Sequence, residues 1–100
     1  MMNFSELDVW KRSRELANHI YHNTKSFPKD EIFGLTSQMR RAAVSVASNI
    51  AEGCGRQHSK DVVKFFYIAR GSVFELEAQL YIASDLDYIN EAVLGDALKK

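Results

Sequence analysis

The sequence is poor in the residues that staple or interrupt small folds, with one cysteine, one proline and five glycines in 100 residues. A single cysteine, Cys54, excludes a disulfide framework within the chain and fits a reducing, cytoplasmic setting. The single proline predicts one enforced helix boundary, because the residue before Pro28 is pushed out of the helical region. Strand-like alternation, internal repeats and low-complexity runs are also missing, so the sequence predicts an all-α fold.

The chain also lacks net charge and long apolar runs. Its 13 basic and 13 acidic side chains balance, and 46% of its residues are hydrophobic, which predicts one globular domain over residues 1–100. No apolar run approaches the roughly 18 residues of a membrane span. No basic segment followed by an apolar run opens the sequence. We therefore expect neither a transmembrane helix nor a signal peptide, and no membrane partner.

The rest of the chain is organised around residues 35–53, where apolar residues recur at three- and four-residue steps. This spacing predicts a helix about 28 Å long. Its three faces are apolar (Leu35, Met39, Ala42, Ala43, Val46, Ile50), polar (Gln38, Arg41, Ser45, Asn49, Glu52, Arg56) and small (Val44, Ala47, Ser48, Ala51). Small side chains permit close approach, so we expect this helix to contact partners on two sides.

Capping signals predict the limits of the first three helices. A capping box of Ser5 and Asp8 starts the first helix, which should run to residue 24. The second helix should end in a left-handed cap at Gly53 or Gly55. Ser59 is the expected N-cap of the third helix, whose apolar pattern continues to residue 83.

Four helices with short connections predict an up-down antiparallel four-helix bundle. Asn90 should start the fourth helix, which is short because only about ten residues follow. With neighbouring helices antiparallel, Trp10, Val46, Ile50 and Phe66 fall at the same level and should form one core layer.

The third predicted helix is apolar on two faces. The main face holds Val62, Phe65, Phe66, Ala69, Val73, Leu76, Leu80 and Ala83. The opposite face, called the aromatic stripe below, holds Tyr67, Gly71, Phe74, Ala78 and Tyr81. Each aromatic ring would remove ~150–250 Å² from water on burial, and the short fourth helix covers only part of this face. We therefore expect the aromatic stripe to be the interface of a homo-oligomer.

Five fragments carry a family resemblance: LDVW, IYHNTKSFPKDE, LTSQMRRAAVSVASNIAEGCGR, IARGSVFELEAQL and LDYIN. They cover nearly all of residues 7–90, and the run QMRRAAVSVASNIAEG is long and specific. The chain resembles bacterial four-helix-bundle proteins of the 23S rRNA intervening-sequence type, a family that includes accessory proteins of diversity-generating retroelements. The C-terminus departs from this pattern, because family members usually carry a longer fourth helix.

The resemblance implies a four-helix bundle that assembles into a homo-oligomer, typically a homopentameric ring, encoded by a gene often carried within an rRNA intervening sequence. It implies RNA or DNA binding only loosely. The retroelement relatives bind nucleic acid and a reverse transcriptase through a strongly basic surface, which this chain, with no net charge, lacks. The resemblance brings no catalytic residue set.

Groups suited to metal binding or catalysis are few. His19 with His22, and Cys54 with His58, are ligand-like pairs that the helix order places at different ends of the bundle. Two ligands are too few for a structural zinc site, so no metal is expected. No nucleophile–base pair, phosphate loop or nucleotide fingerprint appears, so we expect no enzyme activity, no cofactor and no small-molecule substrate.

Polar side chains of the second and third helices form a predicted polar seam of Gln38, Ser45, Asn49, Glu52, Ser72 and Glu75. Hydrogen bonds along this seam would fix the register of the two helices, because buried polar groups need partners. Acid–base chemistry by the glutamates is the alternative, and the register role is preferred.

The candidate nucleic-acid-binding residues are Arg40, Arg41, Arg56, Lys60, Lys64 and Arg70. Three of them, Arg56, Lys60 and Lys64, step by four and are called the basic row below. Phosphate contact needs little more than such a row. Salt bridges to Glu52 and Asp61 are the alternative role for these side chains.

The charge distribution leaves the same two possibilities open. Residues 1–70 hold 11 basic and 7 acidic side chains (+4), and residues 71–100 hold 2 and 6 (−4). Such asymmetry fits either a patch for an anionic partner or ordinary surface variation. The preferred hypothesis is a non-enzymatic oligomeric bundle that binds structured RNA, such as rRNA, or a ribonucleoprotein. A protein-binding adaptor without nucleic-acid contact is the alternative.

Overall fold

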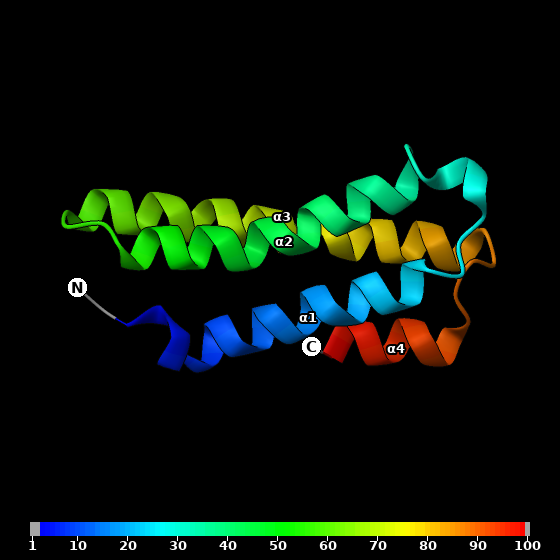
Figure 1. Cartoon of the computed structure of the whole chain (residues 1–100), viewed down its shortest axis with the longest axis horizontal. Coiled ribbons are helices and arrows are strands. Elements are labelled where there is room, and N and C mark those ends of the chain that lie inside the picture. The colour runs from blue at the N-terminus through cyan, green and yellow to red at the C-terminus, as the bar shows by residue number, and fades with distance from the viewer. Residues whose placement is uncertain (1–2, 100) are drawn as a thin grey trace.

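The computed structural model describes residues 3–99, with side chains to residue 97, and within this part the chain is all-α. The α-helices are α1 (Asp8–Thr24), α2 (Leu35–Cys54), α3 (Ser59–Asp85) and α4 (Glu91–Lys99). Short 3₁₀ helices, η1 (Phe4–Glu6) and η2 (Lys29–Glu31), precede α1 and α2. Successive helices run antiparallel (Figure 1), which confirms the predicted up-down four-helix architecture. No helix of the described part is both long enough and apolar enough to span a membrane.

The bundle is elongated, with extents of 44 × 22 × 17 Å, because α3 alone has 27 residues and spans about 40 Å. Helix α2 packs between α1 and α3, and α4 contacts both α1 and α3 on the other side. No Cα atom of α1 lies within 8 Å of a Cα atom of α3. These two helices are therefore diagonal in the bundle, and only α4 fills the space on that side.

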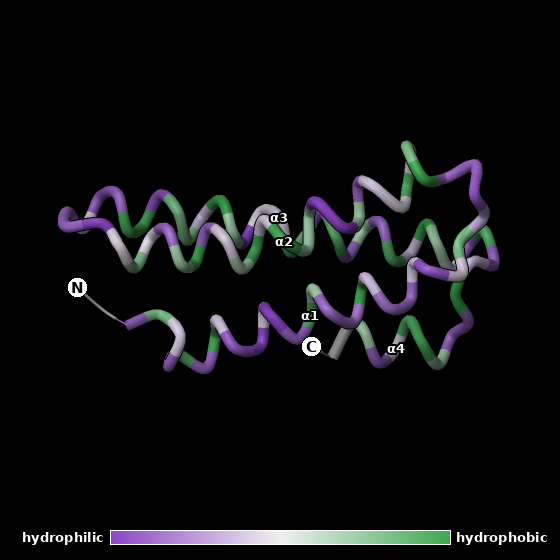
Figure 2. Tube along the Cα trace, viewed as in Figure 1, coloured by the Kyte–Doolittle hydropathy of each residue, from purple (hydrophilic) through white to green (hydrophobic). Residues whose placement is uncertain are grey.

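The buried side chains form two separate clusters. The larger one includes Ile20, Met39, Leu76 and Ala83, and it also takes in Ala97 of α4. The smaller one contains only Val46, Ile50 and Ala69, with Trp10 packed against it. Hydrophobic residues are spread along all four helices in Figure 2, so the smaller cluster is not due to a polar sequence. It lies where α4 no longer accompanies the other three helices.

The predicted caps are right in position more often than in mechanism. Asn90 accepts a hydrogen bond from the Val93 amide at 2.8 Å, which confirms it as the start of α4. The Ser5 capping box is wrong: Ser5 lies in η1, its hydroxyl donates to Asn3, and α1 begins after Leu7 without a side-chain cap. Chain reversal between η1 and α1 separates the two residues of the expected box.

The other two capping predictions also need correction. Helix α2 ends where expected, at Cys54, but Gly55 has φ −85° and not a left-handed conformation. Gly53 lies inside the helix for a steric reason, since a Cβ there would stand 2.9 Å from the Phe66 ring. Ser59 is the first residue of α3, and His58 occupies the cap position.

Three members of the predicted core layer pack together, and the fourth does not. Trp10 contacts the cluster of Val46 and Ile50, as expected. Phe66 is 38% exposed, and its ring lies against Gly53. Ala69, one turn further along α3, takes the inner position in that layer.

A side-chain clasp joins the α1–α2 connection to the turn after α3. The Tyr88 hydroxyl donates to Glu31 Oε2 at 2.8 Å, and Glu31 Oε1 accepts from the Leu35 amide at the start of α2. The Tyr88 ring also packs on Phe27, with centroids 5.1 Å apart. The clasp therefore holds both loops at one end of the bundle.

This clasp predicts a loss of stability at alkaline pH. The hydrogen bond to Glu31, then desolvation and the nearby carboxylates, raises the pKa of Tyr88 above its usual 10.0. A raised folded-state pKa means that the contribution is complete below about pH 10 and is lost as the pH rises through the folded-state value. Urea titrations should show a stability difference between wild type and Tyr88→Phe that shrinks above pH 10. Parallel pH profiles for the two proteins would contradict this.

Candidate nucleic-acid interface

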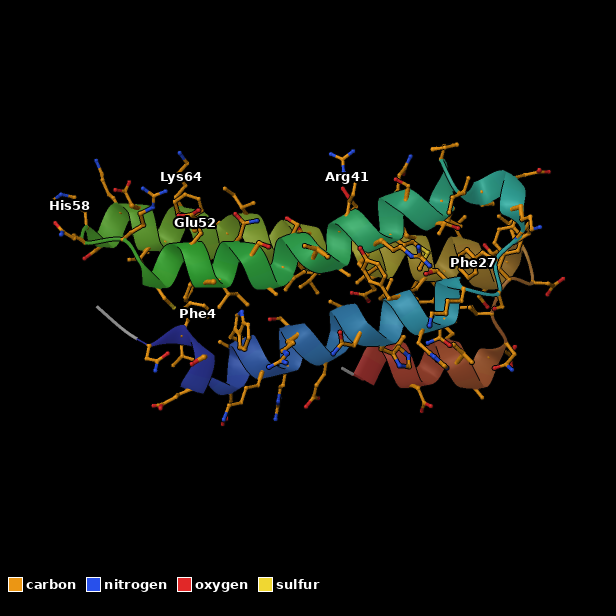
Figure 3. All side chains as sticks on the ribbon, viewed as in Figure 1. Phe4, Phe27, Arg41, Glu52, His58 and Lys64 are labelled. Atoms are coloured by element: carbon orange, nitrogen blue, oxygen red, sulfur yellow. The ribbon has the colours of Figure 1, made fainter. Side chains whose placement is uncertain are left out.

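The connection between α2 and α3 brings the basic row together at one end of the bundle. Arg56 lies just after α2, while Lys60 and Lys64 lie in the first two turns of α3, and all three side chains are exposed. Figure 3 shows Lys64 and His58 at this end, with Glu52 nearby on α2. Three cations from two elements thus share one solvent-facing surface.

An aromatic ring that the sequence assigned to the core organises this surface. The Arg56 guanidinium lies 4.7 Å from the centroid of the Phe65 ring, and Lys64 Nζ lies 6.0 Å from it. Such contacts restrict the cations without neutralising them. The periodicity of α3 gave no sign of this role, because Phe65 belongs to the main apolar face and Arg56 reaches it across the loop.

One of the expected salt bridges exists. Arg56 Nη2 lies 3.0 Å from Glu52 Oε2, one helical turn back, and both side chains are about half exposed. Lys60, Lys64 and Asp61 form no ion pair within the described part of the chain. An exposed pair of this kind is worth ~0–1 kcal/mol, so a phosphate competes with Glu52 for Arg56 at little cost.

The remaining three candidate residues lie apart from the basic row. Arg40 is partly buried and donates to Thr24 at 2.8 Å while lying over the Tyr21 ring, so it joins α1 to α2. Arg41 projects from α2 on the same side of the bundle as Lys64 (Figure 3) but further along it. Arg70 extends over the Phe74 ring, with its guanidinium carbon 5.5 Å from the centroid. The six candidates therefore do not form one patch.

The polar seam is present in its middle part. Ser45 and Ser72 join α2 to α3 through hydroxyl oxygens 2.9 Å apart, and Asn49 donates to Ser45. Gln38 and Glu75 line a shallow polar depression between the same helices. Glu52 faces Arg56 instead of the seam. Hydrogen bonding within the seam fits a role in helix register, which stays a prediction.

The aromatic stripe of α3 is exposed in the single chain. Tyr67, Phe74 and Tyr81 are 64%, 58% and 50% exposed, and a Cβ at Gly71 would have no neighbour within 4 Å. Helix α4 therefore leaves the stripe uncovered along its whole length.

The candidate metal ligands are dispersed. His19 and His22 lie in α1, Cys54 is buried at the end of α2, and His58 is exposed before α3. Within the described residues, no group of three or more His, Cys, Asp or Glu side chains is arranged to hold a metal ion.

Comparison with known proteins agrees with the all-α bundle. A comparison with curated proteins finds no match. The model of one family, the 23S rRNA-intervening sequence proteins, matches residues 5–100, which is almost the entire sequence and all four helices. The chain belongs to the 23S rRNA-intervening sequence protein family.

Proposed function

We propose that this protein is a non-enzymatic, homo-oligomeric helical bundle that binds structured RNA through the basic row. The observation that carries the proposal is the convergence of Arg56 and Lys64 on one exposed aromatic ring, with Lys60 beside them. Phosphate contacts need cations that keep their charge and face solvent, and these side chains do both. The family name adds an association with ribosomal RNA, and the rRNA partner is part of the proposal.

Charge reversal of the basic row tests RNA binding. The triple variant Arg56→Glu, Lys60→Glu and Lys64→Glu should lose binding to a labelled hairpin RNA in a low-salt filter assay. The bundle should stay folded, because all three side chains are exposed. Wild-type binding should weaken steeply with added salt, by about 0.7–0.9 log units per log unit of salt for each phosphate contacted.

A matched variant separates this site from the effect of net charge. Lys11→Glu, Arg14→Glu and Lys25→Glu change the same total charge at exposed positions of α1. This control should keep most of the wild-type affinity. Equal loss in both triple variants, or unchanged affinity in the basic-row variant, would remove the basic row as the RNA site.

The second candidate function is a protein-binding adaptor, and the exposed aromatic stripe favours it. Rings 50–64% exposed on one helix face are suited to a protein contact. Salt distinguishes the two functions, because a contact with an apolar centre should persist where phosphate-driven binding is lost. We assign the stripe first to contacts between copies of this chain, in a ring of five.

A further inference from the structure

An apolar groove of about 490 Å³ runs between the first half of α1 and the first two thirds of α3. Its floor is formed by Val46 and Ile50 of α2 together with Ala69. Val9 of α1 and Val73 of α3 line its walls and are 53% and 39% exposed. The groove therefore exposes the smaller of the two core clusters along one side.

The groove occupies the fourth-helix position of the bundle. Ala97, near the end of α4, lines one end of it. Helix α4 has 9 residues and α3 has 27, so α4 accompanies α3 over about 14 of its roughly 40 Å. Figure 1 shows α4 beside the second half of α1 only. Since α1 and α3 are diagonal neighbours, the space beyond α4 has the width of a helix and continues its line.

Charged side chains at the groove are mainly basic. Arg12 of α1 and Arg70 of α3 both line it, and neither forms an ion pair with any residue that the structure describes. Glu77 is the carboxylate among the lining residues. An occupant with carboxylates along its flanks would meet two guanidinium groups that have no partner in this chain.

We propose that the groove binds an amphipathic α-helix of a partner protein, with its apolar face on Val46, Ile50 and Ala69 and with acidic side chains facing Arg12 and Arg70. Binding of this kind extends the bundle by the same helix packing that α4 uses. The proposal is independent of RNA binding, because no residue of the basic row lines the groove.

A second copy of this chain fits the groove less well. Its exposed aromatic stripe is bordered by Lys64 and Arg70, which would then face Arg12 and Arg70 with like charge. Single-stranded RNA is also disfavoured, because the floor is aliphatic and offers bases neither aromatic faces nor hydrogen-bond partners.

Synthetic peptides test the proposal directly. The probe is a fluorescein-labelled 16-residue helical peptide with leucines at i, i+3, i+4 and i+7 spacing and glutamates flanking them. Two comparison peptides carry lysine in place of glutamate, or the same residues in scrambled order. Fluorescence anisotropy with the full-length wild-type protein should show binding of the glutamate peptide at least ~10-fold tighter than of either comparison peptide.

Charge reversal on the protein provides the reciprocal measurement. Arg12→Glu with Arg70→Glu should weaken the glutamate peptide by ~10-fold or more and tighten the lysine peptide, because attraction and repulsion exchange. The control Lys25→Glu with Arg41→Glu, at exposed positions outside the groove, should change neither affinity by more than ~3-fold.

Three results would overturn the proposal. The first is a glutamate peptide that does not bind, or that binds the reversed variant as tightly as the wild type. The second is an RNA oligonucleotide that displaces the peptide and loses affinity with Arg70→Glu, which would assign the groove to nucleic acid. The third is a wild-type oligomer that dissociates with Val73→Glu, which would assign the groove to a second copy.

Discussion

Sedimentation of the wild-type protein at tens of micromolar should give about 57 kDa, five times the 11.4 kDa chain, whereas a Tyr67→Glu, Gly71→Glu double variant should sediment as a monomer. Both substitutions place carboxylates in the aromatic stripe. Neither residue lines the groove between α1 and α3, so loss of assembly would report on the stripe alone.

The expected effect is large because of the area involved. Tyr67, Phe74 and Tyr81 are each at least half exposed, which leaves roughly 300 Å² of ring surface in water for side chains of ~150–250 Å² each. At ~25 cal/mol per Å², burial of that area contributes several kcal/mol per copy as an upper bound. Gly71 has open space around it, which lets a neighbouring helix approach closely.

The symmetry of the contact decides the mass. A head-to-tail contact repeated around an axis closes into a ring, while stripe against stripe gives a dimer. The control, Asn18→Glu with Ser48→Glu, adds the same charge at exposed positions of α1 and α2 and should keep the wild-type mass. A monomeric wild type, or a stripe variant that sediments like the wild type, would refute assembly through this face.

The second large effect is expected in the main core. Ile20→Ala should lower the free energy of unfolding by about 2–5 kcal/mol, since Ile20 is 1% exposed and packs in the larger cluster. This is a large share of the ~5–15 kcal/mol that stabilises a typical domain. Ile32→Ala is the matched control: Ile32 is 49% exposed, and its loss should cost less than about 1 kcal/mol.

Urea denaturation at one fixed protein concentration provides the measurement, because assembly makes apparent stability depend on concentration. The slope of the transition should stay the same in both variants, so that the midpoint alone reports stability. Equal costs at the two positions would contradict the division into a buried core face and an exposed turn.

The fold itself was accessible from the sequence, because helical periodicity and chain punctuation are local properties. The 35–53 pattern anticipated α2 to within one residue, and Asn90 marked the start of α4 through a hydrogen bond to the next turn. The caps at Ser5 and Gly55 were wrong because cap geometry depends on how the chain enters and leaves the helix. Sequence preference alone does not specify that path.

For the candidate interface, spacing predicted the basic row but not its setting. Steps of four place Lys60 and Lys64 on one side of α3. Only the fold shows that Arg56 crosses the loop to share the Phe65 ring with Lys64, and that Arg40 is held by Thr24 and Tyr21. Contacts between residues far apart in the chain leave no periodic signal.

The sequence by itself determined that α3 is apolar on two faces, since composition and period require nothing else. Only the tertiary structure decided which face is covered and where. Phe66 and Val73 belong to the predicted core face, yet they are 38% and 39% exposed because α4 ends before it reaches them. Whether an apolar side chain is buried depends on how far a neighbouring helix extends, and that length belongs to the partner helix and not to α3.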